Sequence, residues 1–399
     1  MVVNIKELLA KATVSLFFIY ILWYAEAIGD AIIVLYGSAC LVVISTLIMI
    51  NGKTYRLAKP SMGLRIWILY AVLSLVFGFL VAKNFDILVS SLVTFLAFLC
   101  ICICVNIICN TLGDIEWVLH ILIFIAVLCA AYTLLFGFDY YNGIYVKTMS
   151  ANNNPNTLGV MMVVGSFCTL YIVKNNIRSI LCTLAMNALF LYIIIICGSK
   201  KALLAVALLL LFWGYLFIKE IFKNAKTYMK IFSIITGIIV LFAIFYYLTH
   251  YYINTVSFQR LMIASESGST KLRTGMYEEA IKMFKASPIC GQGYNQFIVL
   301  SSSGKYSHST YAELISCGGI IGTFTFMLPI VIGGIQLIKN ARREFNYKTG
   351  LILNLFCVEI FLGAVNIYMY EFIHLIVWTI IFISIEKSGF ILERECLNG

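Results

Sequence analysis

Long apolar runs recur along the whole chain and constrain its fold more than any other feature. Many contain 18 or more residues with few charges, which is enough to cross a bilayer core of about 30 Å as a helix. Only 12% of the 399 residues are charged, and the mean hydropathy is +0.98; a typical soluble protein carries about twice that charged fraction. The sequence therefore predicts an all-α, polytopic membrane protein that forms a single integral membrane domain over residues 1–399.

The boundaries of the apolar runs predict about twelve membrane-spanning helices. They lie at 11–28, 31–50, 65–82, 86–109, 115–136, 156–173, 179–197, 202–219, 231–249, 310–337, 350–368 and 372–386. No small-residue cleavage site follows the first run, so this run is predicted to be a span and not a removed signal. The largest connection is a loop at 250–309.

Basic residues predict the orientation of these spans. Most of the 28 Lys and Arg residues lie in one alternate set of connections, which includes Lys53, Arg56, Lys226 and Arg342. Cytoplasmic loops carry this excess. Both termini are therefore expected in the cytoplasm and the 250–309 loop outside. The formal net charge of +10 follows from the same bias, and no nucleic-acid partner is expected.

The stretch "NNNPNTLG" at 152–159 opens one predicted helix on the outer side. Pro155 suits the first helical position, because its missing N–H would be unpaired there anyway. Asn154 is then the natural N-cap. Capping does not explain the other amides, including Asn156, and amides over a helix N-terminus could also bind an anion or a sugar. Both interpretations stay open.

Two more predicted helices begin on the outer side with polar clusters. "GSKKALL" places Lys200 and Lys201 at a helix N-terminus, where the dipole disfavours cations unless an anion binds; the alternative is snorkelling of both side chains to the interface. "KYSHSTYAEL" places His308 among capping hydroxyls. A lone histidine is usually structural, but this one is expected at the water–lipid boundary.

The outer loop contains "STKLRTGMYEEAIKMFKASPICGQGYNQF". One apolar stripe at helical spacing comprises Met276, Tyr277, Ala280, Ile281 and Phe284. We therefore predict an amphipathic helix lying on the outer membrane surface. Arg273 is expected just before the helix body, and its guanidinium can bind phosphate oxygens in a bidentate manner. Arg260 is a second candidate, and either arginine could instead be a solvated loop residue.

These stretches, in this order, resemble the O-antigen polymerase and O-antigen ligase superfamily of bacterial membrane proteins. The matching pieces are "NPNTLG", "GSKKALL", "LRTGMYEEAIKMFKASPICGQGYNQF" and "HSTYAELISCGGIIG". Each is short, but the four occur in the family's order on the predicted outer face, and the agreement extends from about residue 150 to about 385. The resemblance implies a polytopic helical fold with a large extracytoplasmic loop in the bacterial cytoplasmic membrane.

The resemblance also implies a metal-independent glycosyltransferase. Such an enzyme moves an oligosaccharide from undecaprenyl pyrophosphate onto an acceptor glycan at the outer face of the membrane. A polymerase would build O-antigen, capsular or exopolysaccharide, whereas a ligase would transfer polymer to the lipopolysaccharide core. Membrane lipid, a flippase and a chain-length regulator are the other candidate partners. No cofactor or metal is expected, and the cysteines and histidines show no metal-ligand spacing.

The family's roles can be assigned to residues that match its motifs. Arg273 matches the loop arginine that holds the donor pyrophosphate, and His308 matches the histidine that assists the reaction. Lys200 stands where the family usually has arginine, which keeps the charge but loses the fork. The candidate site thus comprises the catalytic residues His308 and Arg273 and the substrate-binding residues Lys200, Lys201, Asn154, Asn156, Arg260 and Glu371.

Glu359 has two interpretations. A carboxylate within a span is costly and often functional, yet it could be a hydrogen-bonded packing residue, and it is not assigned to the site. Glu371 and His374 are expected at the outer face, where they could join the cavity. A different class of protein, a flippase for the same lipid-linked sugars, would need a charged path through the membrane centre. The predicted spans carry few charges, which favours surface chemistry over transport. A structural scaffold would leave the outer polar clusters unexplained.

Overall fold

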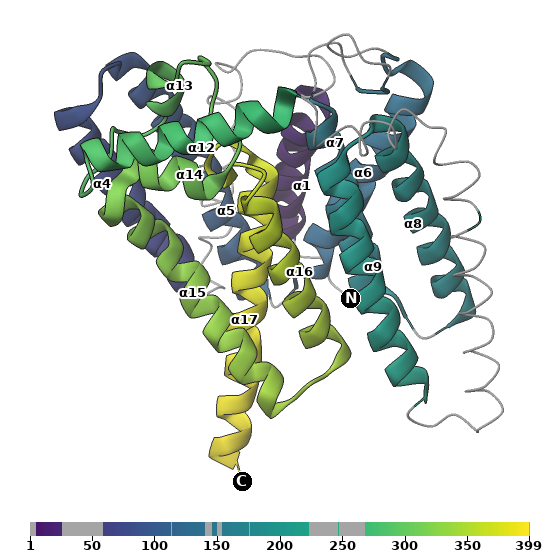
Figure 1. Ribbon diagram of the computed structural model, residues 1–399. Coiled ribbons are helices and arrows are strands. Elements are labelled where there is room, and N and C mark those ends of the chain that lie inside the picture. Colours follow the sequence, from purple (N-terminus) through teal and green to yellow (C-terminus); the bar gives the residue numbers. More distant parts are fainter. Residues whose placement is uncertain are drawn as a thin grey trace. The chain divides into compact units, whose positions relative to one another are not determined.

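The computed structural model describes residues 5–25, 59–112, 114–139, 146–149, 154–174, 176–222, 246 and 268–398 (Figure 1). These residues form helices and no β-strand. The elements are α1 (Ile5–Ile19), η1 (Tyr20–Ala25), α4 (Met62–Val81), α5 (Phe85–Leu112), α6 (Glu116–Phe136), α7 (Pro155–Ile172), α8 (Ile177–Cys197), α9 (Lys200–Phe222), α12 (Gly268–Ala286), α13 (Phe297–Leu300), α14 (Thr310–Glu313), η4 (Leu314–Gly318), α15 (Gly319–Arg343), α16 (Tyr347–Gly363), η5 (Tyr368–Tyr370) and α17 (Phe372–Asn398).

The all-helical prediction is confirmed for the described residues, and each predicted range that falls on them coincides with a helix. The largest difference is at α17, which was predicted to end at 386 and continues to Asn398. Seven of the described helices are long and apolar enough to cross a membrane. The predicted helices at 31–50 and, apart from Tyr246, at 231–249 lie outside the described residues. The total of about twelve spans stays a prediction.

The chain divides into two compact units. Unit 1 combines Met1–Ile121, Lys271–Glu344 and Glu359–Gly399, and unit 2 combines Leu122–Thr270 and Phe345–Val358. Each unit is therefore built from segments that are far apart in the sequence. The predicted single membrane domain stays a prediction.

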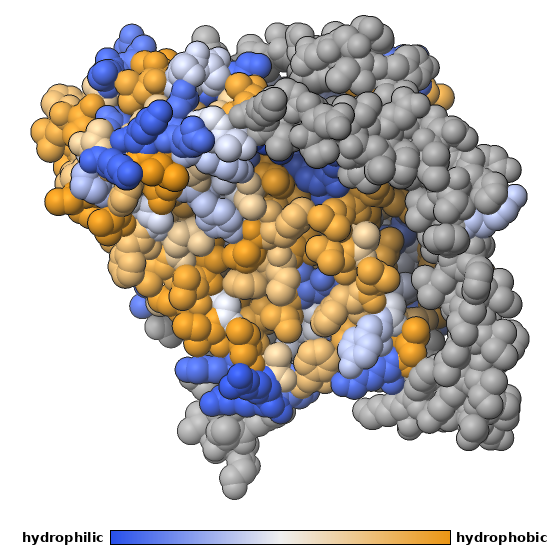
Figure 2. All heavy atoms as spheres, in the orientation of Figure 1, coloured by the Kyte–Doolittle hydropathy of each residue, from blue (hydrophilic) through white to orange (hydrophobic). Residues whose placement is uncertain are grey.

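Unit 1 exposes apolar side chains along its helices. On α4 and α15 these include Leu69, Val72, Leu75, Val76, Phe79, Leu80, Ile320, Phe324, Val331, Ile335 and Ile338. Figure 2 shows this hydrophobic surface between hydrophilic side chains near the two ends of α15. An apolar face of this extent marks a protein or membrane contact, and the length of the helices favours the membrane.

An aromatic cluster packs α4 against α15 and α17 in unit 1. Trp67 stacks on Phe326 with ring centroids 5.1 Å apart and meets Phe382 edge-on at 5.4 Å. Trp67 also donates from Nε1 to the carbonyl of Phe326 at 3.0 Å. The buried indole therefore satisfies its own N–H within the core.

A break in the helix beginning at Thr310 creates a docking point for the preceding loop. The π-helix η4 separates α14 from α15, and π-helical turns of this kind often mark functional sites. The carbonyls of Ser316 and Cys317 accept from the N–H groups of Gln292 and Gly293 at 3.0 and 2.9 Å. The loop that follows α12 is thus hydrogen-bonded directly to the interrupted helix.

Helix α12 packs on protein through part of its apolar stripe. Met276 and Ala280 are buried against Phe297, Ala312 and Cys317. In Figure 1, α12 lies across the end of α15 at which α14 and η4 are found. The prediction that the whole stripe faces lipid is therefore wrong for Met276 and Ala280. The stripe is divided, because Tyr277 and Ile281 on its other edge are 38% and 47% exposed.

Unit 2 is built around α7, whose side chains are almost all buried. Polar side chains connect its neighbours within this apolar surrounding. Asn187 of α8 donates to Thr169 Oγ1 of α7 at 2.9 Å. Asn354 of α16 donates to the carbonyl of Leu209 of α9 at 3.0 Å. Such bonds between spanning helices specify which faces meet, since lipid offers no competing partner.

We predict opposite effects of alanine at two glycines of unit 1. Gly319 has φ +58°, and an added Cβ would lie 2.5 Å from the Gly291 nitrogen. Gly319→Ala should destabilise the protein by about 1–3 kcal/mol through strain and overlap. Gly275 lies within α12 with no atom within 4 Å of an added Cβ, so Gly275→Ala should stabilise it by about 0.5–1 kcal/mol. Thermal unfolding of the detergent-solubilised variants at one scan rate measures both, and equal effects would contradict the docking role of Gly319.

Candidate active site

The turn at residues 307–309 leads into α14 and carries His308. His308 has φ +57°, in the left-handed region that non-glycine residues rarely adopt. Ser309 is the N-cap of α14, as the sequence suggested, and its side chain accepts from Ala312 N at 3.5 Å. The imidazole of His308 is half-buried and packs on Tyr306 with ring centroids 4.4 Å apart. The residues on both sides of the histidine are buried.

Glu313 places a carboxylate beneath this turn. Its side chain is fully buried. One oxygen accepts from Ser307 N at 3.1 Å and from Ser307 Oγ at 2.6 Å. The other accepts from the Tyr370 hydroxyl at 2.9 Å and the Cys317 thiol at 3.6 Å. Both oxygens are therefore engaged inside the protein, which leaves Glu313 poorly placed to accept a proton from a sugar.

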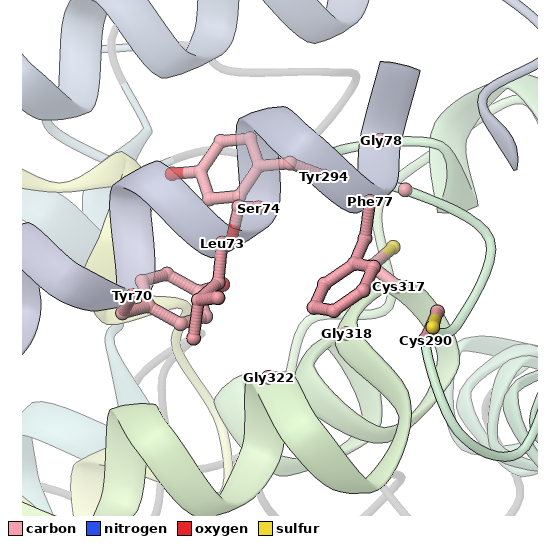
Figure 3. A pocket seen from close by; sticks show the side chains of 11 residues that line it. Tyr70, Leu73, Ser74, Phe77, Gly78, Cys290, Tyr294, Cys317, Gly318 and Gly322 are labelled. Carbon is pink, nitrogen blue, oxygen red and sulfur yellow. The ribbon is translucent and has the colours of Figure 1, made fainter. Parts of the chain in front are cut away.

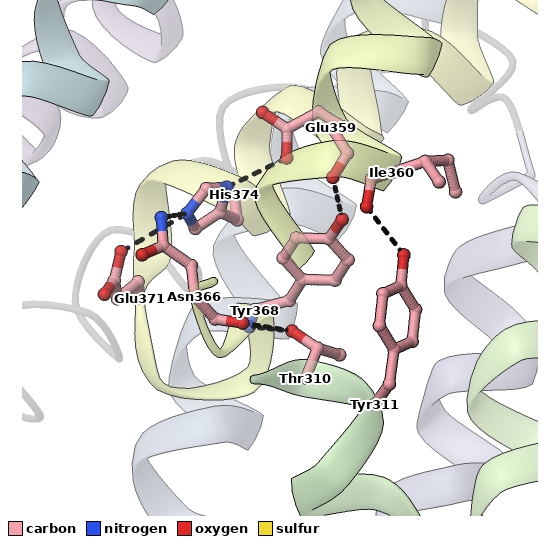
Figure 4. Close-up of polar contacts among 8 residues, drawn as sticks. All are labelled: Thr310, Tyr311, Glu359, Ile360, Asn366, Tyr368, Glu371 and His374. Atoms are coloured by element: carbon pink, nitrogen blue, oxygen red, sulfur yellow. Dashed lines mark hydrogen bonds and ion pairs between the residues drawn. The ribbon is translucent and has the colours of Figure 1, made fainter. Parts of the chain in front are cut away.

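A second turn, at residues 364–371 between α16 and α17, is hydrogen-bonded to the first. Thr310 donates to the Asn366 carbonyl at 2.7 Å from both its backbone N–H and its hydroxyl. Tyr368 N donates to Thr310 Oγ1 at 3.0 Å (Figure 4). Together with the bond between Tyr370 and Glu313, these contacts fix the turn that precedes Glu371 against the segment that follows His308.

Glu359 of α16, His374 of α17 and Glu371 at the end of the second turn form an acid–base cluster. Glu359 Oε2 lies 2.8 Å from His374 Nδ1, and Glu371 Oε2 lies 3.3 Å from His374 Nε2. Asn366 Nδ2 also lies 2.8 Å from His374 Nε2. Figure 4 shows the imidazole between the two carboxylates. The side chains of His374 and Glu359 are 0% and 1% exposed, whereas that of Glu371 is 28% exposed.

This cluster gives Glu359 the hydrogen-bonded partner that the packing interpretation requires, and a functional role stays a hypothesis. The carboxylate has a specific partner in His374 and does not stand alone in the apolar interior. Sequence reasoning noted Glu359 as a costly intramembrane charge and His374 as a neighbour of the site, but it did not pair them. The pairing could have been predicted, because an acid and a histidine occur in two consecutive apolar helices and each needs a polar partner when buried.

Arg273 lies in the second turn of α12, which begins at Gly268 and therefore earlier than predicted. Its side chain is half-buried. Within the described part of the chain, no hydrogen bond or ion pair involves its guanidinium. Residues four apart share a helix face, and Tyr277 on the same face as Arg273 donates to the Ala364 carbonyl at 3.3 Å. Arg273 is thus on the side of α12 that contacts the 364–371 turn.

Unit 2 holds the polar motifs at the starts of α7 and α9. Asn154 caps α7 and accepts from Asn156 N at 3.0 Å, and Pro155 takes the first helical position, so both predictions are confirmed. Ser199 donates to Asn156 Oδ1 at 3.0 Å. This contact brings "NPNTLG" and "GSKKALL" together and gives the amide of Asn156 a structural partner. Lys200 is the first residue of α9.

The predicted site residues are therefore divided between the two units. Arg273, His308 and Glu371 belong to unit 1, where α12 and the two turns are in contact. The residues of unit 2 are Asn154, Asn156, Lys200 and Lys201. Arg260 lies outside the described residues. The predicted binding and catalytic roles of all these residues stay predictions.

A small pocket of unit 1 lies between α4 and the η4 break (Figure 3). Tyr70 and Ser74 line it from α4, Tyr294 and Cys290 from the loop after α12, and Cys317 and Gly318 from η4. None of the described side chains that line it carries a permanent charge, so it does not suit a pyrophosphate. Across the described part of the chain, no group of three or more His, Cys, Asp or Glu side chains could hold a metal ion.

Residues 185–327 match the family model for O-antigen ligase. This segment of the chain is therefore similar to the O-antigen ligase family. This match confirms the resemblance to the O-antigen ligase and polymerase superfamily, and no curated protein matches the chain. The matched segment includes Lys200, Lys201, Arg273, His308 and Glu313. The family implies a glycosyl-transferring membrane enzyme that acts on a lipid-linked glycan. Glu359, Glu371 and His374 lie beyond the match.

We predict that the stability of unit 1 depends on keeping Glu359 and His374 paired, so that removal of one partner costs more than removal of both. His374→Leu leaves the Glu359 carboxylate without its partner in the interior and should cost about 3–5 kcal/mol. The double variant Glu359→Leu/His374→Leu removes both polar groups and should recover most of that loss. Thermal unfolding of the purified single and double variants tests this expectation. Additive losses would show that the two side chains act independently.

Proposed function

We propose that the protein joins undecaprenyl-pyrophosphate-linked repeat units into O-antigen, capsular or exopolysaccharide at the outer face of the bacterial cytoplasmic membrane. The observation that carries the proposal is the grouping of Arg273 and His308 in one unit within the O-antigen ligase segment. The guanidinium, which has no polar partner among the described residues, lies on the face of α12 that contacts the 364–371 turn. Thr310, two residues after His308, is hydrogen-bonded to that turn. Glu371 lies at the end of the same turn.

The reaction needs a group that stabilises the leaving phosphates and a group that accepts a proton. An acceptor hydroxyl attacks the anomeric carbon of the donor sugar, and a new C–O bond forms there. The bond from that carbon to the pyrophosphate breaks, and its electron pair leaves with undecaprenyl pyrophosphate. Arg273 stabilises the developing charge through bidentate contacts. His308 accepts the hydroxyl proton, since imidazole is suited to this role near neutral pH. This chemistry requires no metal or cofactor.

The helix that begins at Thr310 supports the assignment of the site to the outer face. It contains 34 residues with the π-helical break included, about 50 Å at helical rise. Its distal end carries Lys339, Arg342 and Arg343, a basic group expected in the cytoplasm. The His308 turn at its other end is then extracytoplasmic. By the same rule both chain termini are cytoplasmic.

In this proposal, the residues of unit 2 bind substrate. The family resemblance alone supports these roles: Lys200 and Lys201 at the start of α9 offer positive charge for phosphate, and the amides of Asn154 and Asn156 offer hydrogen bonds for sugar hydroxyls. The hydrogen bond between Ser199 and Asn156 supports a structural role for these two residues and not a binding role. A flippase and a chain-length regulator are proposed partners, because polymer assembly at the outer face needs exported units and a stopping signal.

An O-antigen ligase is the second candidate. It would use the same donor chemistry and differ in its acceptor, the lipid A-core. The matched family carries that name, while the four motifs are shared by polymerases. A flippase for the same lipid-linked sugars would instead move its substrate through the membrane.

Deletion of the gene separates these functions. Loss of a polymerase should abolish long surface polysaccharide and leave single repeat units on the lipid carrier at the outer leaflet. A ligase deletion would instead leave polymer on the carrier, and a flippase deletion would leave single units on the cytoplasmic leaflet. Gel electrophoresis measures chain length. Labelling of spheroplasts measures how much glycan is accessible to an enzyme added from outside, and the two measurements together distinguish the outcomes.

We predict that activity depends on the bidentate geometry of the Arg273 guanidinium and not only on its positive charge. Arg273→Lys keeps the charge but loses the fork, a loss of about 1.5–3 kcal/mol, or about ten- to a hundredfold in rate if felt in the transition state. Lys285→Ala, on an exposed position of the same helix, is the matched control and should leave polymer amount unchanged. Polymer is quantified by gel at equal membrane levels of each variant. Normal polymer from Arg273→Lys would exclude bidentate binding by this residue.

A further inference from the structure

The left-handed conformation of His308 has to be held by its surroundings. Among the described non-glycine residues, only Asn295 shares a positive φ, at 56°. Asparagine and histidine adopt this region more often than other non-glycine residues, although it is uncommon for both. Non-glycine residues persist in this conformation where neighbouring structure over-determines it, and such sites are frequently functional.

The residue before the histidine is fixed by two hydrogen bonds to one carboxylate oxygen. Ser307 is fully buried, and both its N–H and its hydroxyl donate to Glu313 Oε2, at 3.1 and 2.6 Å. The residues after the histidine are fixed by the Ser309 cap and by the bond from Thr310 N to Asn366 O at 2.7 Å. His308 thus lies between anchored neighbours. Its half-buried ring is more accessible to solvent than the buried Ser307, Ser309 and Thr310.

The second oxygen of Glu313 anchors the other turn. It accepts from the Tyr370 hydroxyl at 2.9 Å and from the Cys317 thiol at 3.6 Å. Donors therefore converge on both oxygens, and only a carboxylate accepts at both. A glutamine would present an NH₂ group to the donors on one side. The geometry explains why an ionisable group occupies a fully buried position.

Burial, reinforced by the negative charge of Glu313, raises the pKa of Tyr370 well above its ordinary value. Its hydroxyl therefore stays protonated and remains a donor at physiological pH.

We propose that Glu313 is the positioning residue for His308, which it holds through Ser307 while it locks the 364–371 turn through Tyr370. This inference rests on the proposed function, because it assumes that His308 takes part in the reaction. It also assigns Glu313 a role other than that of an alternative base. A side chain that can accept hydrogen bonds at only one of the two Glu313 oxygen positions, such as glutamine, should loosen the His308 turn and misplace the imidazole.

A double-mutant cycle on activity tests the proposal. Ser307→Ala and Glu313→Gln, each introduced alone, should lower polymer formation by about ten- to a hundredfold, as misplacement of a reacting group does. In a His308→Ala background, the same two changes should cause no further loss, since residues that act as a unit are non-additive. Ser303→Ala is the matched control, because Ser303 bonds only within residues 301–305, and it should keep wild-type polymer. Polymer is quantified over a dilution series in cells that lack the chromosomal gene.

A spectroscopic measurement separates positioning from general stability. In protein labelled with ¹⁵N-histidine, the resonance that disappears in His308→Ala identifies His308. Ser307→Ala should shift or broaden that resonance and leave the His374 resonance in place. If Glu313→Gln does not reach the membrane, Ser307→Ala and Tyr370→Phe decide the question by the same two measurements.

Three results would overturn the inference. Wild-type polymer from His308→Ala would remove both the proposed role of the histidine and the reason to position it. An inactive His308→Ala with fully active Ser307→Ala and Glu313→Gln would overturn positioning alone and leave the proposed function intact. A further loss of activity from Ser307→Ala in the His308→Ala background would show that the serine acts independently of the histidine.

Discussion

The core of a bilayer offers no hydrogen bonds, so a polar group carried into it by a helix has to find its partner within the protein. This constraint explains the arrangement of unit 1. The buried acids of α14 and α16 are paired with groups on other segments of the chain: Glu313 with Tyr370, and Glu359 with His374. Because the partners lie on different segments, satisfying these groups also determines how the segments fit together.

The same contacts gather the candidate catalytic residues. His308 precedes α14, Glu371 precedes α17, and the bonds from Thr310 to Asn366 join the two turns. The interrupted helix contributes as well, since the π-helical turn leaves carbonyls that accept from the loop after α12. That loop and the buried edge of α12 then support Arg273. The candidate site is thereby held by polar contacts at one end of an apolar bundle.

Helix positions and caps could be read from the sequence because their causes are local. Asn154 and Pro155 begin α7 as expected, since an N-cap and a proline act within one turn. The stripe on α12 was read correctly as a helix and incorrectly as a wholly lipid-facing surface. Periodicity identifies an apolar face but gives no information about what covers it, and here Phe297 and Cys317 cover Met276 and Ala280.

The sequence by itself determined that the chain is helical and apolar enough for a membrane, and its motifs showed a resemblance to the superfamily whose ligase model matches residues 185–327. These properties depend on composition, short-range spacing and residue order. Only the tertiary structure decided that Glu313 is engaged with Ser307 and Tyr370, that Glu359 is paired with His374, and that His308 adopts a left-handed conformation. The pairings with Tyr370 and His374 depend on distances between different segments of the chain, and the engagement of Ser307 and the His308 conformation depend on the surrounding contacts. Hydrophobic periodicity contains no information about either.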